Sequence, residues 1–217
     1  MSSTTMSSTM SSTWRRHLIS VLAAMLALPA LWIGAARETA AQATASLAGQ
    51  LLVASSSMGD PRFERTVILM IRHDKDGAFG IVINRPVGER PLAALLETLG
   101  EKDTTATGSV SIFAGGPVQP EIGFVVHSTD YQRPATFEVN ARIAMTSSRE
   151  ILRDIGNGKG PQKSLIAFGY AGWGPGQLEG ELARRDWVLA PAESKLVFDE
   201  DRDKVWDSAF AQRTQDL

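Results

Sequence analysis

The residues with the clearest potential for chemistry lie in GYAGWGPGQLEGE, a glycine-rich stretch at residues 169–181. It stands between an apolar run and an amphipathic segment, a position where α/β proteins often bind phosphate. A Walker loop requires Gly-Lys-Ser/Thr, but the stretch has no lysine, and a dinucleotide loop beginning at Gly172 would place its last glycine at Gln177. Glu179 and Glu181 would also repel an anion from the start of the following helix. We therefore expect no nucleotide and no other cofactor.

A metal site is the next possibility, because HDKDG at residues 73–77 brings a histidine and two aspartates together. The calcium-loop pattern does not continue, since the positions that should hold ligands are occupied by Arg72 and Ile83. Asp76-Gly77 between two apolar runs is instead typical of a β-hairpin turn. The sequence predicts a hairpin here and no metal site.

Catalysis by a histidine and a serine would have to use His127, which follows the apolar run IGFVV and precedes Ser128. A histidine at a strand end can act as a general base, but the chain has no G-x-S-x-G elbow. The serines at 55–57 are typical of a turn. We favour a hydrogen-bonded structural His127, with a hydrolase using His127 and a serine as the alternative. The chain has no cysteine, which excludes disulfides and a thiolate nucleophile.

The N-terminus resembles an export leader. After MSSTTMSSTMSST come Arg15 and Arg16, an apolar run at residues 18–36, and AQA at 41–43 as a cleavage site. Residues 1–43 are therefore predicted to be a signal peptide of a periplasmic or secreted protein. An uncleaved leader would be the only membrane contact. Twin-arginine export, a retained anchor, and a mis-assigned start with a cytoplasmic product are the alternatives.

Charge limits the partners. Residues 1–43 hold three arginines and one glutamate, so 19 basic and 23 acidic residues follow them. No run of Lys or Arg exceeds two, which disfavours nucleic acid as a partner. We expect an unknown protein, peptide or small ligand instead.

The elements that must position these residues indicate an α+β fold, because strands cluster before the helices appear. Residues 44–217 are expected to form a single domain with its core at about 47–200. The strand-like runs are 49–54, 65–73, 78–86, 109–115, 122–128, 164–171 and 186–191, and the helical ones are 91–100, 147–156, 176–185 and the C-terminal tail. Ser148 is expected to cap the second helix, and Gly100 and Gly156 to end the first two.

Three long blocks resemble the YqgE/AlgH family, in order and in spacing. They are MGDPRFERTVILMIRHDKDGAFGIVINRP, FAGGPVQPEIGFVVHS and FGYAGWGPGQLEGELARRDWVLAPA. The resemblance covers about residues 47–200. It implies one α+β domain whose bifurcated, mostly antiparallel sheet folds into a pseudo-barrel with flanking helices. It brings no defined reaction, cofactor or metal, only a regulator label tied to alginate control. Two features depart from the family: the leader, and Arg72 where an acidic residue often precedes the histidine.

Three glycine-containing turns are predicted to meet at one end of this pseudo-barrel and to form a cleft for a ligand. The candidate binding residues are Asn84, Arg85, Gly115, Gly116, His127, Gly172, Trp173, Gly176, Gln177 and Glu179. The plain alternative is that these glycines only allow the backbone to turn. A β-branched residue in place of Gly172 is expected to destabilise the fold if φ is positive there, and Trp173 is expected to close the barrel end.

Arg85 allows two interpretations. Its guanidinium could clamp a ligand carboxylate, or it could pair with an internal acid such as Glu179. The favoured function is a non-catalytic binding or regulatory module. The alternatives are the hydrolase and, if the start is mis-assigned, a cytoplasmic transcriptional regulator.

Overall fold

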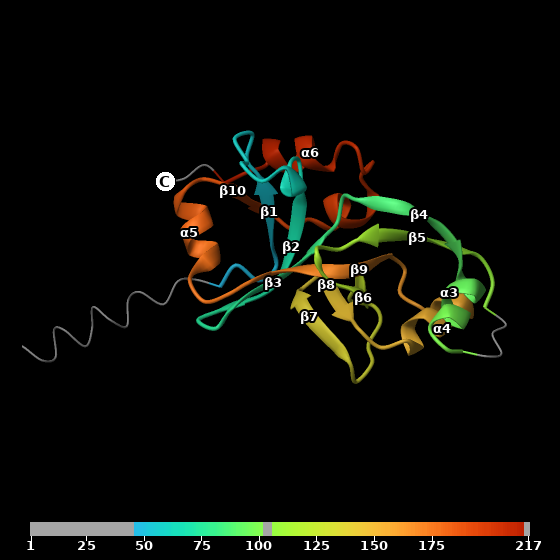
Figure 1. The fold of residues 1–217 in the computed structure, drawn as a ribbon. Helices are drawn as coiled ribbons and strands as arrows, with labels where there is room; N and C mark the ends of the chain where they lie inside the picture. Colours follow the sequence, from blue (N-terminus) through green and yellow to red (C-terminus); the bar gives the residue numbers. More distant parts are fainter. Residues whose placement is uncertain (1–45, 102–105, 215–217) are drawn as a thin grey trace, which may run out of the picture. The chain divides into compact units, whose positions relative to one another are not determined.

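A ten-stranded, mostly antiparallel β-sheet, curled into a half-barrel with flanking helices, organises the part of the chain that the structure describes (Figure 1). The structure is a computed structural model, and it describes residues 46–101 and 106–214. The leader predicted at residues 1–43 lies outside these ranges. Residues from Ser46 onwards form one compact unit, so the α+β fold and the single domain are confirmed.

The elements have the following bounds. The strands are β1 (Gln50–Ala54), β2 (Val67–Asp74), β3 (Gly77–Val82), β4 (Pro86–Pro91), β5 (Ser109–Ala114), β6 (Val118–Ser128), β7 (Thr136–Asn140), β8 (Ile143–Thr146), β9 (Ser164–Trp173) and β10 (Trp187–Pro191). The α-helices are α3 (Leu92–Thr98), α4 (Glu150–Gly156), α5 (Gln177–Ala183) and α6 (Val205–Ala211), with a short 3-10 helix at Pro61–Phe63 and a π-helix at Lys195–Asp199.

Strand β9 is where the sheet divides. The path of paired strands runs β10-β1-β2-β3-β9-β6-β8-β7, and a β4–β5 pair branches from β9. On one edge of β9, residues 166–168 pair with β5 in parallel and residues 171–173 pair with β3 in antiparallel fashion. On the other edge, β9 pairs with β6 as far as Tyr170. This branching confirms the bifurcated sheet.

Successive side chains along a strand point to opposite faces, so apolar residues pack on both faces of the sheet. The largest buried cluster includes Leu51, Leu69 and Leu165. A second cluster joins Met70, Trp173 and the helix α5. A third packs α3 and α4 against β5, β6 and β9. Each fully buried aliphatic side chain stabilises the fold by about 1.5–3 kcal/mol, which holds the strand ends in place.

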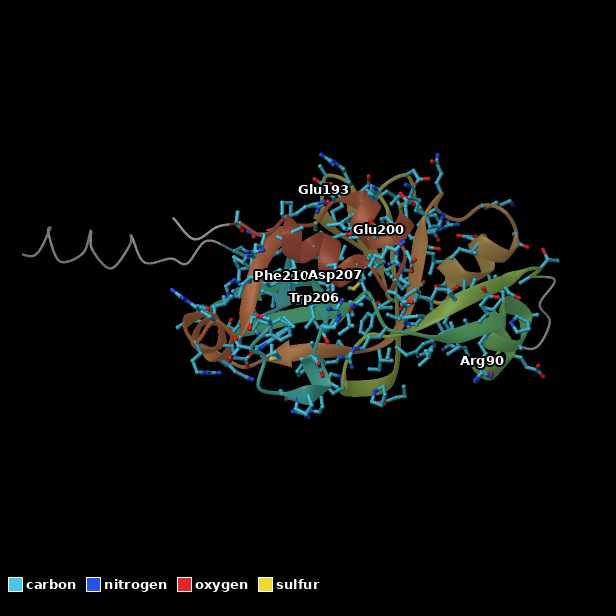
Figure 2. The ribbon with its side chains drawn as sticks, turned by 90° about the horizontal axis from the view of Figure 1, so that it is seen from above. Arg90, Glu193, Glu200, Trp206, Asp207 and Phe210 are labelled. Carbon is cyan, nitrogen blue, oxygen red and sulfur yellow. The ribbon has the colours of Figure 1, made fainter. Side chains whose placement is uncertain are left out.

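The C-terminal tail is helical, as predicted, and its helix α6 packs against the largest cluster through Val205 and Ala209. The indole N–H of Trp206 donates to the Ala54 carbonyl over 2.8 Å. Figure 2 shows Trp206 on α6 far from Arg90 on β4. The helix therefore anchors the end of the chain to β1.

Some predicted boundaries are wrong. The strands β4, β7 and β8 were not predicted, because β4 begins and ends with proline and the other two are short and partly polar. Helix α4 begins at Glu150 after Arg149, one residue later than predicted, and the Ser148 hydroxyl accepts the N–H of Glu150 over 3.3 Å, so Ser148 does cap the start of the helix. Its last residue is Gly156, as predicted, and the left-handed conformation that follows belongs to Gly158 and not to Gly156. Gly100 does adopt the left-handed conformation after α3.

The hairpin predicted at residues 73–77 is confirmed, since β2 ends at Asp74 and β3 begins at Gly77. The Asp74 side chain accepts from the N–H of Asp76 over 2.9 Å, which supports the turn. In the described ranges, no set of His, Asp and Glu side chains is grouped so that it could hold a metal ion. The helices in those same ranges are all too short or too polar to cross a bilayer.

Candidate functional site

A groove lies beside the last three residues of β9. Its walls come from the segment 58–63, from Pro117 and Val118, from α5 and from Trp187 at the start of β10. Its volume is about 520 Å³, which is within the range of ligand pockets. A loop, a strand end and a helix therefore surround one space, and we take it as the candidate site.

A single carboxylate organises the floor of the groove. Glu181 Oε2 accepts the indole N–H of Trp173 and that of Trp187, each over 2.8 Å, and its Oε1 accepts from Gln177 Nε2 over 3.0 Å. Trp173 therefore packs in the cluster with Leu178 rather than closing the barrel end as predicted. Each hydrogen bond to a charged group contributes about 1.5–3 kcal/mol, so the two indoles are held in one arrangement.

The rim of the groove carries charges that are already paired. Arg62 contacts Asp60 over 2.7 Å, and Arg184 contacts Asp186 over 2.9 Å. The side-chain hydrogen bond from Arg62 holds the pKa of the Asp60 carboxyl below its ordinary value. Each guanidinium therefore already has a carboxylate partner on the rim.

The glycines of β9 play a different part from the predicted one. The φ of Gly172 lies outside the left-handed region, so the conformational reason for expecting a large loss of stability from a β-branched residue at this position does not apply. The positive values belong to Gly169, at 75°, and to Gly176, at 72°. Gly176 forms the N-cap of α5. Because β9 extends to Trp173, Gly169 and Gly172 lie inside the strand and not in a turn.

The glycines that permit a close approach are Gly115, Gly116 and Gly169, where the chain crosses β9. Gly115 bonds to β9 on the edge shared with β5, through its N–H to the Phe168 carbonyl over 2.7 Å, and Val118 pairs with Tyr170 on the opposite edge. A Cβ at Gly169 would lie 2.4 Å from the Gly116 carbonyl oxygen, and one at Gly115 would lie 2.4 Å from that of Gly169. No side chain fits between the two backbones.

Arg85 and Asn84 hold the segment that follows residue 63. One guanidinium nitrogen of Arg85 donates to the Thr66 hydroxyl over 2.7 Å and to the Glu64 carbonyl over 3.1 Å. The Asn84 amide bonds to the Val67 N–H and to the Arg65 carbonyl. The predicted pairing of Arg85 with an acid is wrong, because its partners are a hydroxyl and a carbonyl.

A smaller cavity of about 230 Å³ is lined by Arg85 and Gly116. It shares Arg62, Phe63 and Pro117 with the groove. The two hollows are therefore neighbours that meet at these three residues, and a ligand in the groove could extend towards Arg85.

His127 lies apart from the groove and is fully buried. Its Nδ1 bonds to the Ser128 carbonyl over 2.8 Å and its Nε2 to the Thr146 hydroxyl over 2.9 Å. The carbonyl can only accept, so Nδ1 carries the proton and Nε2 accepts from the threonine. Burial lowers the pKa of His127, which keeps the ring neutral.

Glu179 pairs with His73 and not with Arg85. The Nε2 of His73 lies 3.0 Å from Glu179 Oε1, and its Nδ1 accepts the N–H of Leu47 over 3.2 Å. The backbone N–H of Glu179 and then the hydrogen bond from His73 lower the pKa of the Glu179 carboxyl. His73 thus ties the first described residues of the chain to α5.

The predicted candidates divide into three groups. Gly172, Trp173 and Gln177 line the groove, and Arg85 and Gly116 line the smaller cavity. The others line neither hollow: Asn84, Gly115, His127, Gly176 and Glu179. The sequence analysis did not include Phe63, Glu181 or Trp187. Helical spacing of Gln177 and Glu181, with two nearby tryptophans that require acceptors, was a usable signal.

The fold and the groove define an α+β protein with a curled, branched sheet and an aromatic-floored groove beside its central strand. The family model described as AlgH-like matches residues 51–217. The chain belongs to this AlgH-like family, which confirms the resemblance.

Relatives and solved structures agree with this assignment. A UPF0301 protein of Sphingopyxis alaskensis is 46% identical over 164 residues, which cover 76% of this chain and 87% of that protein. One of Caulobacter vibrioides is 44% identical over 168 residues, covering 76% of this chain and 86% of that one. The solution structure of the AlgH protein from Pseudomonas aeruginosa matches with a TM-score of 0.68 and 38% identity, over 78% of this chain and 89% of that one.

Proposed function

We propose that the protein is a non-catalytic binding module, and that the groove beside β9 holds a peptide or a small ligand. The observation that carries the proposal is the arrangement of Glu181, which orders Trp173 and Trp187 before any ligand arrives. A preordered floor lowers the entropic cost of binding. The exposed Gly172 leaves the wall above this floor without a side chain.

The hydrolase alternative gains no support from the surroundings of His127. Both ring nitrogens are engaged, by Ser128 and Thr146, and the side chain has no exposed surface. A general base must come within hydrogen-bond reach of a substrate proton. The carboxylates that line the groove are all engaged as well, because Glu181 accepts three hydrogen bonds and Asp60 and Asp186 are paired with Arg62 and Arg184.

The transcriptional alternative is equally unsupported, because no run of Lys or Arg longer than two is present to bind a phosphate backbone. We place the module in the periplasm. The first contacts of the domain are made by Ser46 and Leu47 with His73. A cut after Ala43 would therefore leave these contacts intact.

The indole N–H signals of the tryptophans provide a direct test of binding. We expect a panel of small ligands and short peptides, titrated into ¹⁵N-labelled protein, to shift the signals of Trp173 and Trp187. Trp206 serves as an internal control, since its N–H donates to Ala54 on a different part of the sheet. Ligand-induced shifts that spare both groove indoles would contradict the proposal, as would a panel that shifts nothing.

The location has its own test. N-terminal sequencing of the protein from a periplasmic fraction should give a first residue at or near Thr44. A cytoplasmic protein that begins downstream of Arg16 would contradict the placement while leaving the binding proposal untouched.

A further inference from the structure

We infer that the ligand of the groove is an uncharged, extended peptide segment of another protein, which adds a short strand to the free edge of β9 at residues 171–173. This inference rests on the proposed binding function and specifies the class of ligand. Strand addition to an exposed sheet edge is a general mode of peptide recognition, in which the backbone supplies affinity and alternate side chains supply specificity.

The edge is free because the partner strands of β9 stop at different points. β3 pairs with Ala171, Gly172 and Trp173 on one edge. On the other edge the β6 pairing reaches only Tyr170, and no other strand within the described ranges pairs with residues 171–173 there. In an antiparallel pair the backbone groups of successive residues point to opposite edges. At least one N–H and C=O of the three residues therefore points away from β3.

The groove lies over the face of β9 that carries Ala171 and Trp173, and its lining reaches the strand edge at Gly172. Side chains of successive strand residues point to opposite faces. The Cβ direction of Gly172 leads towards the ring of Tyr170, whereas Trp173 packs with Leu178 on the other face. Both Gly172 and Trp173 nevertheless line the groove. Gly172 has no side chain, so it lines the groove through its backbone, whose N–H and C=O lie in the plane of the sheet.

The surroundings leave a lane for an added strand. The chain crosses β9 at residues 116–118 and β6 begins beside Tyr170, so the strand pairing of β6 does not extend to residues 171–173. A strand added beside residues 171–173 would continue the direction of β6, and its three paired residues would span about 10 Å. Gly172 presents no side chain that would conflict with the neighbouring residue of the ligand.

The charges of the groove favour an uncharged segment. Arg62 is paired with Asp60, Arg184 is paired with Asp186, and Glu181 accepts three hydrogen bonds, so the charges of the groove already have partners. A charged ligand would meet no unpaired charge of opposite sign, and burying its own charge costs free energy. A β-prone segment of neutral residues meets no such cost.

The test uses three synthetic peptides and the full chain. The parent is the blocked pentapeptide acetyl-Thr-Val-Thr-Val-Thr-amide. The other two carry N-methyl groups, one on both valines and one on all three threonines, so that each removes the donors from one edge of the peptide. Affinities are measured by NMR titration of the backbone amides.

We expect the parent to shift the amides of residues 171–173 and to slow their hydrogen exchange. One methylated peptide should bind at least about tenfold more weakly and the other about as well as the parent, because only one edge of an added strand bonds to β9. Equal affinity of all three, or equal loss from both methylated peptides, would overturn the inference. An absence of parent binding would also overturn it.

These outcomes separate the inference from the proposed function. Suppose that small ligands shift the indole signals of Trp173 and Trp187, and that the parent and both N-methylated peptides bind with equal affinity. This result would support the binding module and would exclude strand addition. Shifts of residues 171–173 on dilution without peptide would show that a second copy covers the edge, and would overturn the inference.

Discussion

The two halves of β9 use the same strand for different purposes. Residues 164–168 are paired on both edges, by β6 along their length and by β5 from residue 166, and Leu165, Ile166 and Ala167 are buried. Residues 171–173 are paired on one edge only, and Gly172 between them is exposed. The first half secures the fold. The second half leaves backbone groups available for a ligand.

The boundary between the halves is the crossing at Gly169. Here the segment that joins β5 to β6 passes over β9, and the Gly116 carbonyl comes close to the Gly169 backbone. Pairing on the β6 edge ends one residue later, at Tyr170. The crossing therefore decides where the doubly paired half ends.

The largest expected effect falls on this boundary. Gly169→Val should lower the free energy of unfolding by more than about 3 kcal/mol or prevent folding, because φ is 75° and the added Cβ would lie 2.4 Å from a carbonyl oxygen. Urea denaturation measures the loss. Gly174→Val is the control and should change stability by under about 1 kcal/mol. Equal losses of unfolding free energy in Gly169→Val and Gly174→Val would show that the crossing is no more constrained than the position of Gly174.

A smaller loss is expected at Arg85, whose carbonyl accepts the N–H of Ala114 at the end of β5. Arg85→Ala should cost about 1–3 kcal/mol, because the Thr66 hydroxyl and the Glu64 carbonyl lose their donor. Arg90→Ala, on the exposed strand β4 (Figure 2), should stay within about 0.5 kcal/mol. Wild-type melting of Arg85→Ala with lost ligand binding would instead identify a ligand clamp.

The doubly paired half should show an acid dependence through His127, which pairs with Ser164. Burial holds the pKa of His127 in the folded protein below its ordinary value of about 6.5, so between these two pKa values mainly the unfolded chain binds the proton. Stability should therefore fall as pH falls through this window, by at most about 1.4 kcal/mol per pH unit. Denaturation of the wild type and of His127→Gln across this range measures the difference. An identical slope in both would contradict it.

The smallest effect on stability is expected in the free half. Gly172→Val should cost under about 1 kcal/mol, since its φ is ordinary and the added Cβ meets only the Tyr170 ring, at 3.1 Å. Thermal melting measures this. A loss as large as that of Gly169→Val would show that the two halves of β9 are equally constrained.

The sequence by itself determined the class of fold, the family and most of the elements. The hairpin at Asp76-Gly77 and the strands β1, β2, β3, β5, β9 and β10 follow from local signals: alternating or continuous apolar residues and turn residues between them. Strand β4 was not predicted, because its sequence PVGERP lacks any such pattern. The sequence also shows the glycines around Gly169, but it does not show which of them adopts a positive φ.

Only the tertiary structure decided the partners and the free edge. Glu181 meets Trp173 and Trp187, Arg85 meets Thr66, and His127 meets Thr146, and each of these contacts joins separate elements. Local periodicity reports whether a residue is buried, and it does not report which distant group comes to lie opposite. The open edge at residues 171–173 depends on where β6 ends beside β9. That end is set by the crossing of two chain segments, a long-range contact that no local pattern encodes.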